Sequence, residues 1–188
     1  MVEEGVQDIT IAKQKAATRL HLPRGQSLPR NEEIQLAVRE YQRLFKHESH
    51  PQTVARLRQT ALKAMSFFKH FEPRLVGAVG DGSASEFSTI TLHLFTEGSE
   101  EVHLFMINQR LPYELGSQRA AHGNGQAVDL PVYQMALEGE NIDLIVFDKI
   151  ALRQPPRDPV THKPMQRLDI KRVEELIRLT ETAQPTPF

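Results

Sequence analysis

The chain has 188 residues, a length that favours one domain with appendages over two large independent domains. Its 39% hydrophobic and 25% charged residues exclude wholesale disorder, and its net charge of −1 excludes a general attraction to nucleic acid or membrane. The absence of cysteine and of any run of about 18 apolar residues excludes disulfides, thiolate metal sites and a membrane span, so a cytoplasmic location is expected.

Residues 1–48 are predicted to form an N-terminal arm, a linker and a helix. Residues 1–19 are polar and only weakly periodic, which favours at most one short helix, and the prolines and glycine of residues 21–30 disfavour regular structure. Asn31 is suited to cap a helix whose apolar residues recur at three-to-four spacing. These apolar residues are Ile34, Ala37, Tyr41, Leu44 and Phe45.

A longer helix is predicted from Ser49, at the start of a core domain that spans residues 49–152. Ser49 and Gln52 have the spacing of a capping box, and Pro51 suits a first helical turn. One side of this helix carries an apolar stripe, which comprises Val54, Leu57, Ala61, Met65 and Phe68. The other side is expected to carry four basic residues, Arg56, Arg58, Lys63 and Lys69.

From Pro73 the apolar pattern changes to that of a sheet. Residues 74–80 predict a buried strand that runs into a glycine-rich turn at residues 80–85, and residues 88–95 predict a strictly alternating strand. Gly98 and Ser99 then open a helix that ends before Pro112. Three more strands are expected at residues 111–115, 128–137 and 141–147, the last two joined by a tight turn. The predicted fold is α+β, a mixed twisted sheet of about five strands with flanking helices.

Residues 153–188 are predicted to form a loop and a final helix that packs on the core domain. Prolines punctuate the loop at residues 153–164, and Asp169 is suited to cap the helix. The buried face of the helix is expected to carry Ile170, Val173, Leu176 and Ile177. From residue 149 onward eight positive charges stand against five negative ones. This excess indicates either a solvated surface or a docking patch for phosphates, in which Arg153 and Arg157 reach the glycine-rich turn.

Polar side chains are expected to gather near this glycine-rich turn. Gly82 and Ser83 are candidates for binding an anion, because glycine lets the backbone approach a ligand and a following helical turn presents free N–H groups. Alternation places a second polar group on one face of the next strand. This group comprises Thr89, Thr91 and His93. Asp143 lies between apolar neighbours in a later strand and joins the same surface if the two strands pair nearby.

Over roughly residues 52–148, this order of elements resembles the core of the DNA polymerase beta-like nucleotidyltransferase superfamily. In that family a Gly-Ser pair starts a short helix that holds nucleotide phosphates. An Asp-x-Asp pair on one strand and a third acid on a later strand then bind two divalent metals for attack on the alpha phosphate. The resemblance maps Gly82 and Ser83 onto the Gly-Ser pair and Asp143 onto the third acid, which implies a metal-binding and catalytic role for Asp143.

The chain departs from the family where the Asp-x-Asp pair should stand. It reads Ser88-Thr89-Ile90-Thr91-Leu92, so both metal-bridging carboxylates are replaced by threonines, which are neutral and bind Mg²⁺ poorly. Loss of the transfer reaction is the preferred interpretation. The alternative is a displaced set of ligands for Mg²⁺ or Mn²⁺ with a nucleoside triphosphate. That set would comprise Asp81, Glu86, His93 and Asp143.

Three functions follow from these observations. The preferred one is a nucleotidyltransferase-like protein that binds a nucleotide or other phosphate ligand, with weak or lost transfer, through Gly82, Ser83, Thr89, Thr91 and Arg153. The second is an active transferase with an atypical metal site that modifies a small molecule, a protein or RNA. The third is a non-catalytic scaffold whose partner protein docks on the helix at residues 50–71. RNA is the less favoured ligand, because no aromatic residues alternate with the C-terminal charges.

Overall fold

The computed structural model describes residues 9–19, 28–30, 33–34, 37, 49–121, 127–153, 155 and 164–182. In these ranges the α-helices are α1 (Ile9–Arg19), α3 (Ser49–Phe67), α4 (Gly77–Asp81), α5 (Ser99–Asn108) and α6 (Ile170–Thr182). The strands are β1 (Arg74–Val76), β2 (Ile90–Thr96), β3 (Glu114–Ala121), β4 (Ala127–Leu137) and β5 (Glu140–Asp148). Two short 3₁₀ helices, η1 (Lys69–Phe71) and η2 (Lys149–Leu152), follow α3 and β5.

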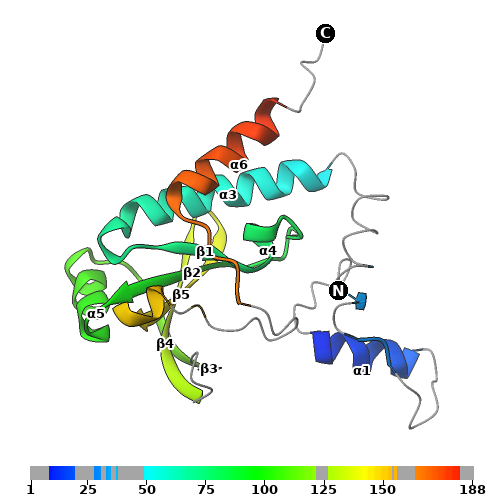
Figure 1. Ribbon diagram of the computed structural model, residues 1–188, viewed down its shortest axis with the longest axis horizontal. Helices are drawn as coiled ribbons and strands as arrows, with labels where there is room; N and C mark the ends of the chain where they lie inside the picture. Colours follow the sequence, from blue (N-terminus) through cyan, green and yellow to red (C-terminus); the bar gives the residue numbers. More distant parts are fainter. Residues whose placement is uncertain are drawn as a thin grey trace.

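The described strands form one mixed sheet in the order β1-β2-β5-β4-β3 (Figure 1). β2 and β5 run parallel, whereas β1 pairs with β2, β5 with β4 and β4 with β3 in antiparallel fashion. The chain passes from β2 to β5 through α5, β3 and β4, because two parallel strands need a crossover connection between them. This arrangement confirms the predicted α+β fold with a mixed sheet and flanking helices.

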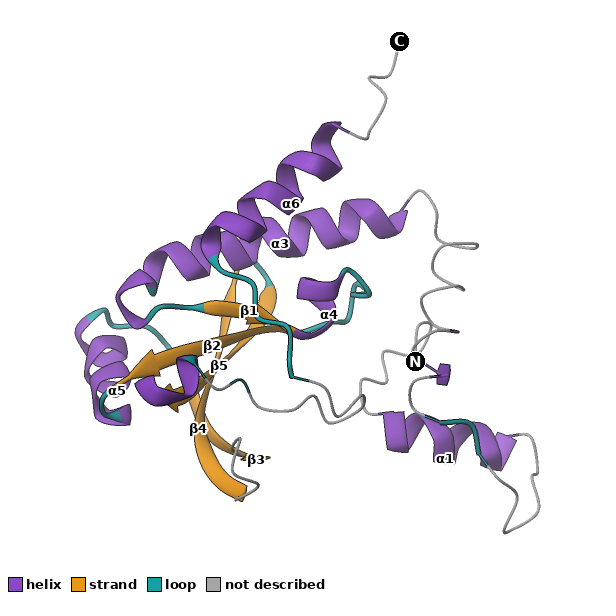
Figure 2. Cartoon of the chain, in the orientation of Figure 1, coloured by secondary structure: helices purple, strands orange, loops and turns teal. Residues whose placement is uncertain are grey.

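One face of the sheet is covered by helices and forms the main core. The stripe predicted for the helix that begins at Ser49 is confirmed: Val54, Leu57, Ala61, Met65 and Phe68 are all buried in this core. The predicted cap of the last helix is also confirmed, since Asp169 Oδ1 accepts a hydrogen bond from the Arg172 backbone N–H at 2.8 Å. Figure 2 shows α6 lying along α3 above the sheet. Val173 and Ile177 of α6 reach the same core.

The opposite face of the sheet carries a second, smaller core. It comprises Phe95, Leu130, Val132, Ile145, Phe147 and Ala151. Because η2 folds back over this face, β2 is buried on both sides, and six of its seven residues are buried. The strict alternation expected for residues 88–95 is therefore wrong as a guide to exposure. The predicted polar face of β2 lies partly beneath an apolar layer.

Two of the predicted strands differ from the structure. The strand expected over residues 74–80 ends at Val76, because Gly77 adopts a φ of 68° and the chain turns into α4. The strand expected at residues 111–115 instead runs from Glu114 to Ala121, where it pairs with β4 along its whole length. The helix predicted after Asn31 and the loop at residues 153–164 lie largely outside the described residues.

Candidate functional site

The parallel pairing of β2 with β5 brings two of the predicted site residues together. Thr91 lies directly opposite Asp143, and Asp143 in turn lies opposite Gln134 on β4. Residues that are directly opposite on neighbouring strands have side chains on the same face. The Gln134 amide Nε2 donates a hydrogen bond of 3.3 Å to Asp143 Oδ1. Thr89, one residue before β2, is half-buried.

The Gly82-Ser83 turn does not have the geometry expected of a phosphate-binding turn. The short helix α4 begins at Gly77 and ends at Asp81, so Gly82 is its C-cap with a φ of 82°. The expectation that Gly82 and Ser83 start the helix is wrong, because the C-terminal end of a helix presents carbonyl groups rather than free N–H groups. The Ser83 backbone N–H and the Ser83 hydroxyl both donate to Asp81 Oδ1, at 2.9 and 2.6 Å. The backbone N–H and the hydroxyl of Ser83 therefore already donate to a carboxylate of the same chain.

The chain's residues do not fit the two-metal centre that the family resemblance implies. In the ranges given above, no group of three His, Asp or Glu side chains is placed to hold a metal ion. The metal set of Asp81, His93 and Asp143 is therefore not brought together, with or without Glu86. Thr91, opposite Asp143, supplies a neutral hydroxyl where a second carboxylate is needed. The catalytic role of Asp143 remains a prediction.

His93 is a buried core residue rather than an exposed ligand. Its side chain is 3% exposed, and its ring centroid lies 4.5 Å from that of Phe147. Burial, and secondarily the charge of Arg167, lowers the pKa of His93 from 6.5 to about 3. The ring is therefore neutral at physiological pH.

Three arginines near these residues have roles that sequence reasoning missed. Arg58, expected on an exposed face of its helix, is 8% exposed and donates hydrogen bonds to the carbonyls of Val79 and Gly80 at the end of α4. Arg74 lies opposite His93 on β1. Arg167 places its guanidinium over the ring of Phe95, 4.8 Å from the centroid. No local pattern marks Arg58 and Arg167, because their partners are distant in the sequence, whereas Arg74 Nη1 donates to the neighbouring carbonyls of Glu72 and Pro73.

We define the arginine–histidine cluster as Arg74, His93 and Arg167. It lies on the same sheet face as Thr91 and Asp143, because residues 91 and 93 of β2 point to one side. Burial, with a smaller effect from the charge of Arg74, lowers the pKa of Arg167 to about 10, so its guanidinium stays protonated at neutral pH. This face can therefore attract an anion.

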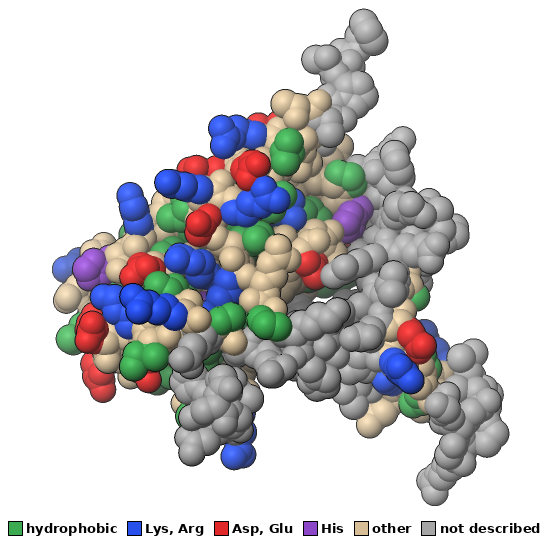
Figure 3. All heavy atoms as spheres, in the orientation of Figure 1, with side chains coloured by type: hydrophobic (Ala, Val, Ile, Leu, Met, Phe, Trp, Pro, Cys, Tyr) green, Lys and Arg blue, Asp and Glu red, His purple; other side chains and the backbone are tan. Residues whose placement is uncertain are grey.

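The basic residues of the C-terminal stretch and of α3 are mostly solvated or paired. Arg153, the residue that follows η2, is exposed, and its role in ligand binding remains a prediction. On α3, Lys63 Nζ lies 2.6 Å from Glu138 Oε1, and Arg56 pairs with Glu140, both at the β4–β5 turn. Figure 3 shows Lys and Arg side chains interspersed with Asp and Glu over the face that carries α3 and α6.

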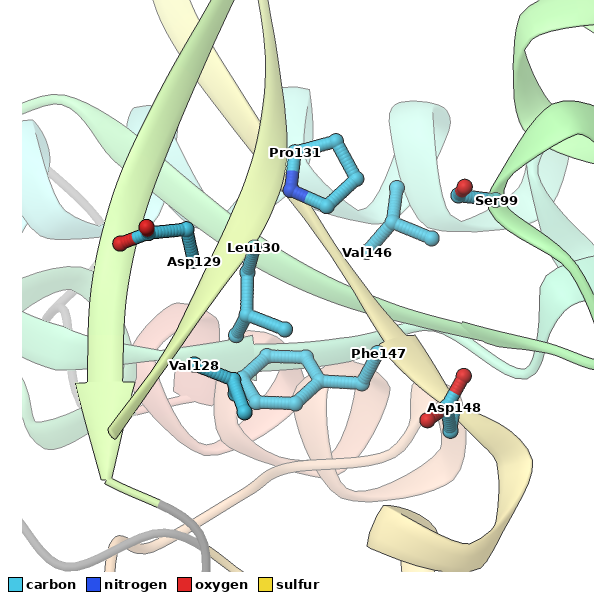
Figure 4. Close-up of a pocket in the computed structure, with 8 residues that line it drawn as sticks. All are labelled: Ser99, Val128, Asp129, Leu130, Pro131, Val146, Phe147 and Asp148. Atoms are coloured by element: carbon cyan, nitrogen blue, oxygen red, sulfur yellow. The ribbon is translucent and has the colours of Figure 1, made fainter. Parts of the chain in front are cut away.

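A separate pocket of about 290 Å³ opens between β4 and β5, where their pairing ends at Val132 and Ile145 (Figure 4). It is lined by Ser99, Val128, Asp129, Leu130, Pro131, Val146, Phe147 and Asp148. Figure 4 shows Asp129 and Asp148 at opposite sides of the pocket. The lining includes two acids and no basic residue, so this pocket does not suit a phosphate, and none of the predicted site residues lines it.

No protein-family model, curated protein or solved structure matches this chain. None of the described helices combines the length and the apolar character that are needed to cross a membrane.

Proposed function

We propose that this chain is a nucleotidyltransferase-like protein that binds a nucleotide or another phosphate ligand and does not transfer nucleotide. One observation carries the proposal: Thr91 on β2 lies directly opposite Asp143 on the parallel strand β5. This register supports the resemblance, in which a third acid lies on a strand beside the Asp-x-Asp pair, but here Asp143 faces a threonine and both acids of the pair are replaced, by Thr89 and Thr91. Two-metal chemistry needs both charges to neutralise the ions.

The charge of the surrounding face supports a phosphate ligand. Arg74 and Arg167 lie on the same side of the sheet as Thr91, and a guanidinium matches the oxygens of a phosphate. Binding at Gly82 and Ser83 is not part of this proposal, because Asp81 occupies the Ser83 donors. An active transferase with displaced metal ligands is not favoured either, since those ligands are not brought together among the described residues. A cytoplasmic location, expected from the absence of cysteine, remains a prediction.

The proposal is tested by the thermal stability of the protein with ATP, CTP, GTP and UTP, each in the presence of Mg²⁺, Mn²⁺ or EDTA. We expect at least one nucleotide to raise the melting temperature equally in all three conditions, because the phosphates are bound by protein cations and not through a metal. Stabilisation that requires Mg²⁺ or Mn²⁺ would contradict the proposal and favour an active transferase. No stabilisation by any nucleotide would contradict it in favour of a protein-interaction scaffold.

The same measurement on Thr91→Asp tests the observation that carries the proposal. This variant places a second carboxylate opposite Asp143, so we expect a lower melting temperature in EDTA and recovery with Mn²⁺. Ser117→Asp, at an exposed position on the edge strand β3, is the matched control and should show no Mn²⁺ effect. Equal Mn²⁺ responses of the two variants would mean that Thr91 and Asp143 do not form a shared site.

A further inference from the structure

We infer that Arg167, with His93 and Arg74, forms a binding site for one phosphate group on the face of the sheet that carries the second, smaller core. The inference deepens the proposed function and rests on it in one respect: the phosphate is taken to belong to the ligand of that function.

The backbone beside β1 fixes the position of Arg167. Leu168 exchanges two hydrogen bonds with Leu75, since the Leu75 N–H donates to the Leu168 carbonyl at 2.8 Å and the Leu168 N–H to the Leu75 carbonyl at 2.9 Å. Arg167 therefore projects over the second core, where its guanidinium lies 5.3 Å from the centroid of Phe147. Its Nη1 donates to the carbonyl of Ala151 at 2.6 Å. One end of the guanidinium is thus held by the protein.

The other edge of the same guanidinium has no partner among the described residues. Arg167 Nε and Nη2 are buried and make no hydrogen bond. These two nitrogens form one side of the guanidinium fork, whose parallel N–H groups match two oxygens of a phosphate. A buried donor without a partner is costly, and native proteins rarely leave one unsatisfied. Two such donors on one edge indicate a bidentate ligand.

The ring of His93 adds a third buried group without a partner. His93 Nδ1 makes no hydrogen bond, although the residue is only 3% exposed. The ring packs against Phe147, the same aromatic residue that supports Arg167. As a neutral ring protonated on Nδ1, His93 would donate one further hydrogen bond to an oxygen of the ligand.

The described residues place positive charge around this site. Arg74 lies opposite His93 and is close enough to Arg167 for its charge to lower the pKa of Arg167. Within the described part of the chain, no carboxylate lies within ion-pair distance of Arg74 or Arg167. Two guanidinium groups that repel each other are stabilised by an anion between or beside them. A phosphate suits this set better than a carboxylate, because its two charges and its tetrahedral oxygens can be shared among donors from different strands.

The probe for this site is inorganic phosphate, compared with NaCl at the same ionic strength. We expect phosphate to raise the melting temperature in a saturable way, and to shift the side-chain Nε–Hε signal of Arg167 in ¹H–¹⁵N spectra. Arg167→Lys keeps the charge but removes the fork, and should weaken phosphate binding by at least about tenfold. The matched control is Arg172→Gln, because Arg172 is exposed on α6 and paired with Glu175. It should leave phosphate binding unchanged.

A parallel titration with ATP separates this inference from the proposed function. Nucleotide binding that Arg167→Lys leaves unchanged, together with no response to phosphate, would overturn the site and leave the proposed function standing. Phosphate binding that depends on Arg167 without any nucleotide binding would support the site and overturn the nucleotide as its ligand. If Arg167→Lys does not fold, the wild-type Nε–Hε signal decides: an unchanged signal at saturating phosphate would overturn the inference.

Discussion

At the scale of single residues, burial determines the chemistry of His93. The folded protein holds this ring neutral, since its pKa is lowered to about 3, first by burial and then by the charge of Arg167. In the unfolded chain the ring takes up a proton near pH 6.5. Below that pH the unfolded state binds more protons than the folded state, so stability falls as the pH drops from about 6.5 toward 3.

This linkage predicts a specific pH dependence of stability. Between pH 7.5 and pH 5.0 the wild-type protein should lose about 2 kcal/mol of its free energy of unfolding through His93 alone. His93→Gln has no titrating group at this position and should lack that part of the loss, as measured by urea unfolding at both pH values. His70→Gln, at an exposed position, is the control and should keep the wild-type loss. Equal pH dependence of all three proteins would show that His93 does not carry the effect.

The candidate site could be predicted from sequence only where local periodicity determines it. Alternation along residues 88–95 placed Thr91 on one face of its strand, but Asp143 joined that surface only on the condition that the two strands pair, and the register of β2 with β5 meets this condition. The expectation that Gly82 and Ser83 start a helix was wrong, because a glycine that follows a short helix and one that precedes it give similar sequence patterns. Arg167 could not be found at all, since only the folded chain brings it to Phe95.

At the scale of elements, α4 is held in place by a side chain from another helix. Arg58 of α3 donates from Nε to the Val79 carbonyl at 3.1 Å and from Nη2 to the Gly80 carbonyl at 3.0 Å. A helix of five residues is not stable by itself. Arg58→Ala leaves both carbonyls without this partner, and we expect it to lower the free energy of unfolding by about 2 to 3 kcal/mol in urea.

Lys63 provides the matched control for Arg58. It lies on the same helix, is exposed, and makes an ion pair with Glu138, whose side chain is also exposed. Lys63→Ala should cost less than about 1 kcal/mol, because exposed ion pairs contribute little. If the two variants lose the same stability, the buried hydrogen bonds of Arg58 do not hold α4.

The elements themselves were predictable where one strong pattern decides them. The apolar stripe of α3 and the paired strands β4 and β5 follow from local sequence alone. Residues 74–80 contain an apolar run without a clear period, and the helix within them depends on Arg58, which no local pattern reveals. The predicted position of β3 differed from the observed one, because an edge strand with mostly exposed side chains shows no apolar alternation.

At the scale of the whole molecule, the C-terminal helix belongs to the same folding unit as the sheet. Val173 of α6 is completely buried in the main core, and Leu168 just before the helix bonds to β1. Core packing therefore couples α6 to strands that lie far from it in the sequence. A helix coupled in this way should not unfold separately from the sheet.

Hydrogen exchange of the Val173→Ala variant tests this coupling. Removing two buried carbon atoms should lower the free energy of unfolding by about 2 kcal/mol, and backbone amides of β5 should lose the same protection as those around residue 173. Leu179→Ala, at a position that is 55% exposed on the same helix, should leave the protection of both sets of amides unchanged. Faster exchange confined to α6 would show that the helix opens alone. If the amides of β5 lose as much protection as those of α6, the helix, β1 and the central strands form one cooperative unit, because only global unfolding exposes all of them together.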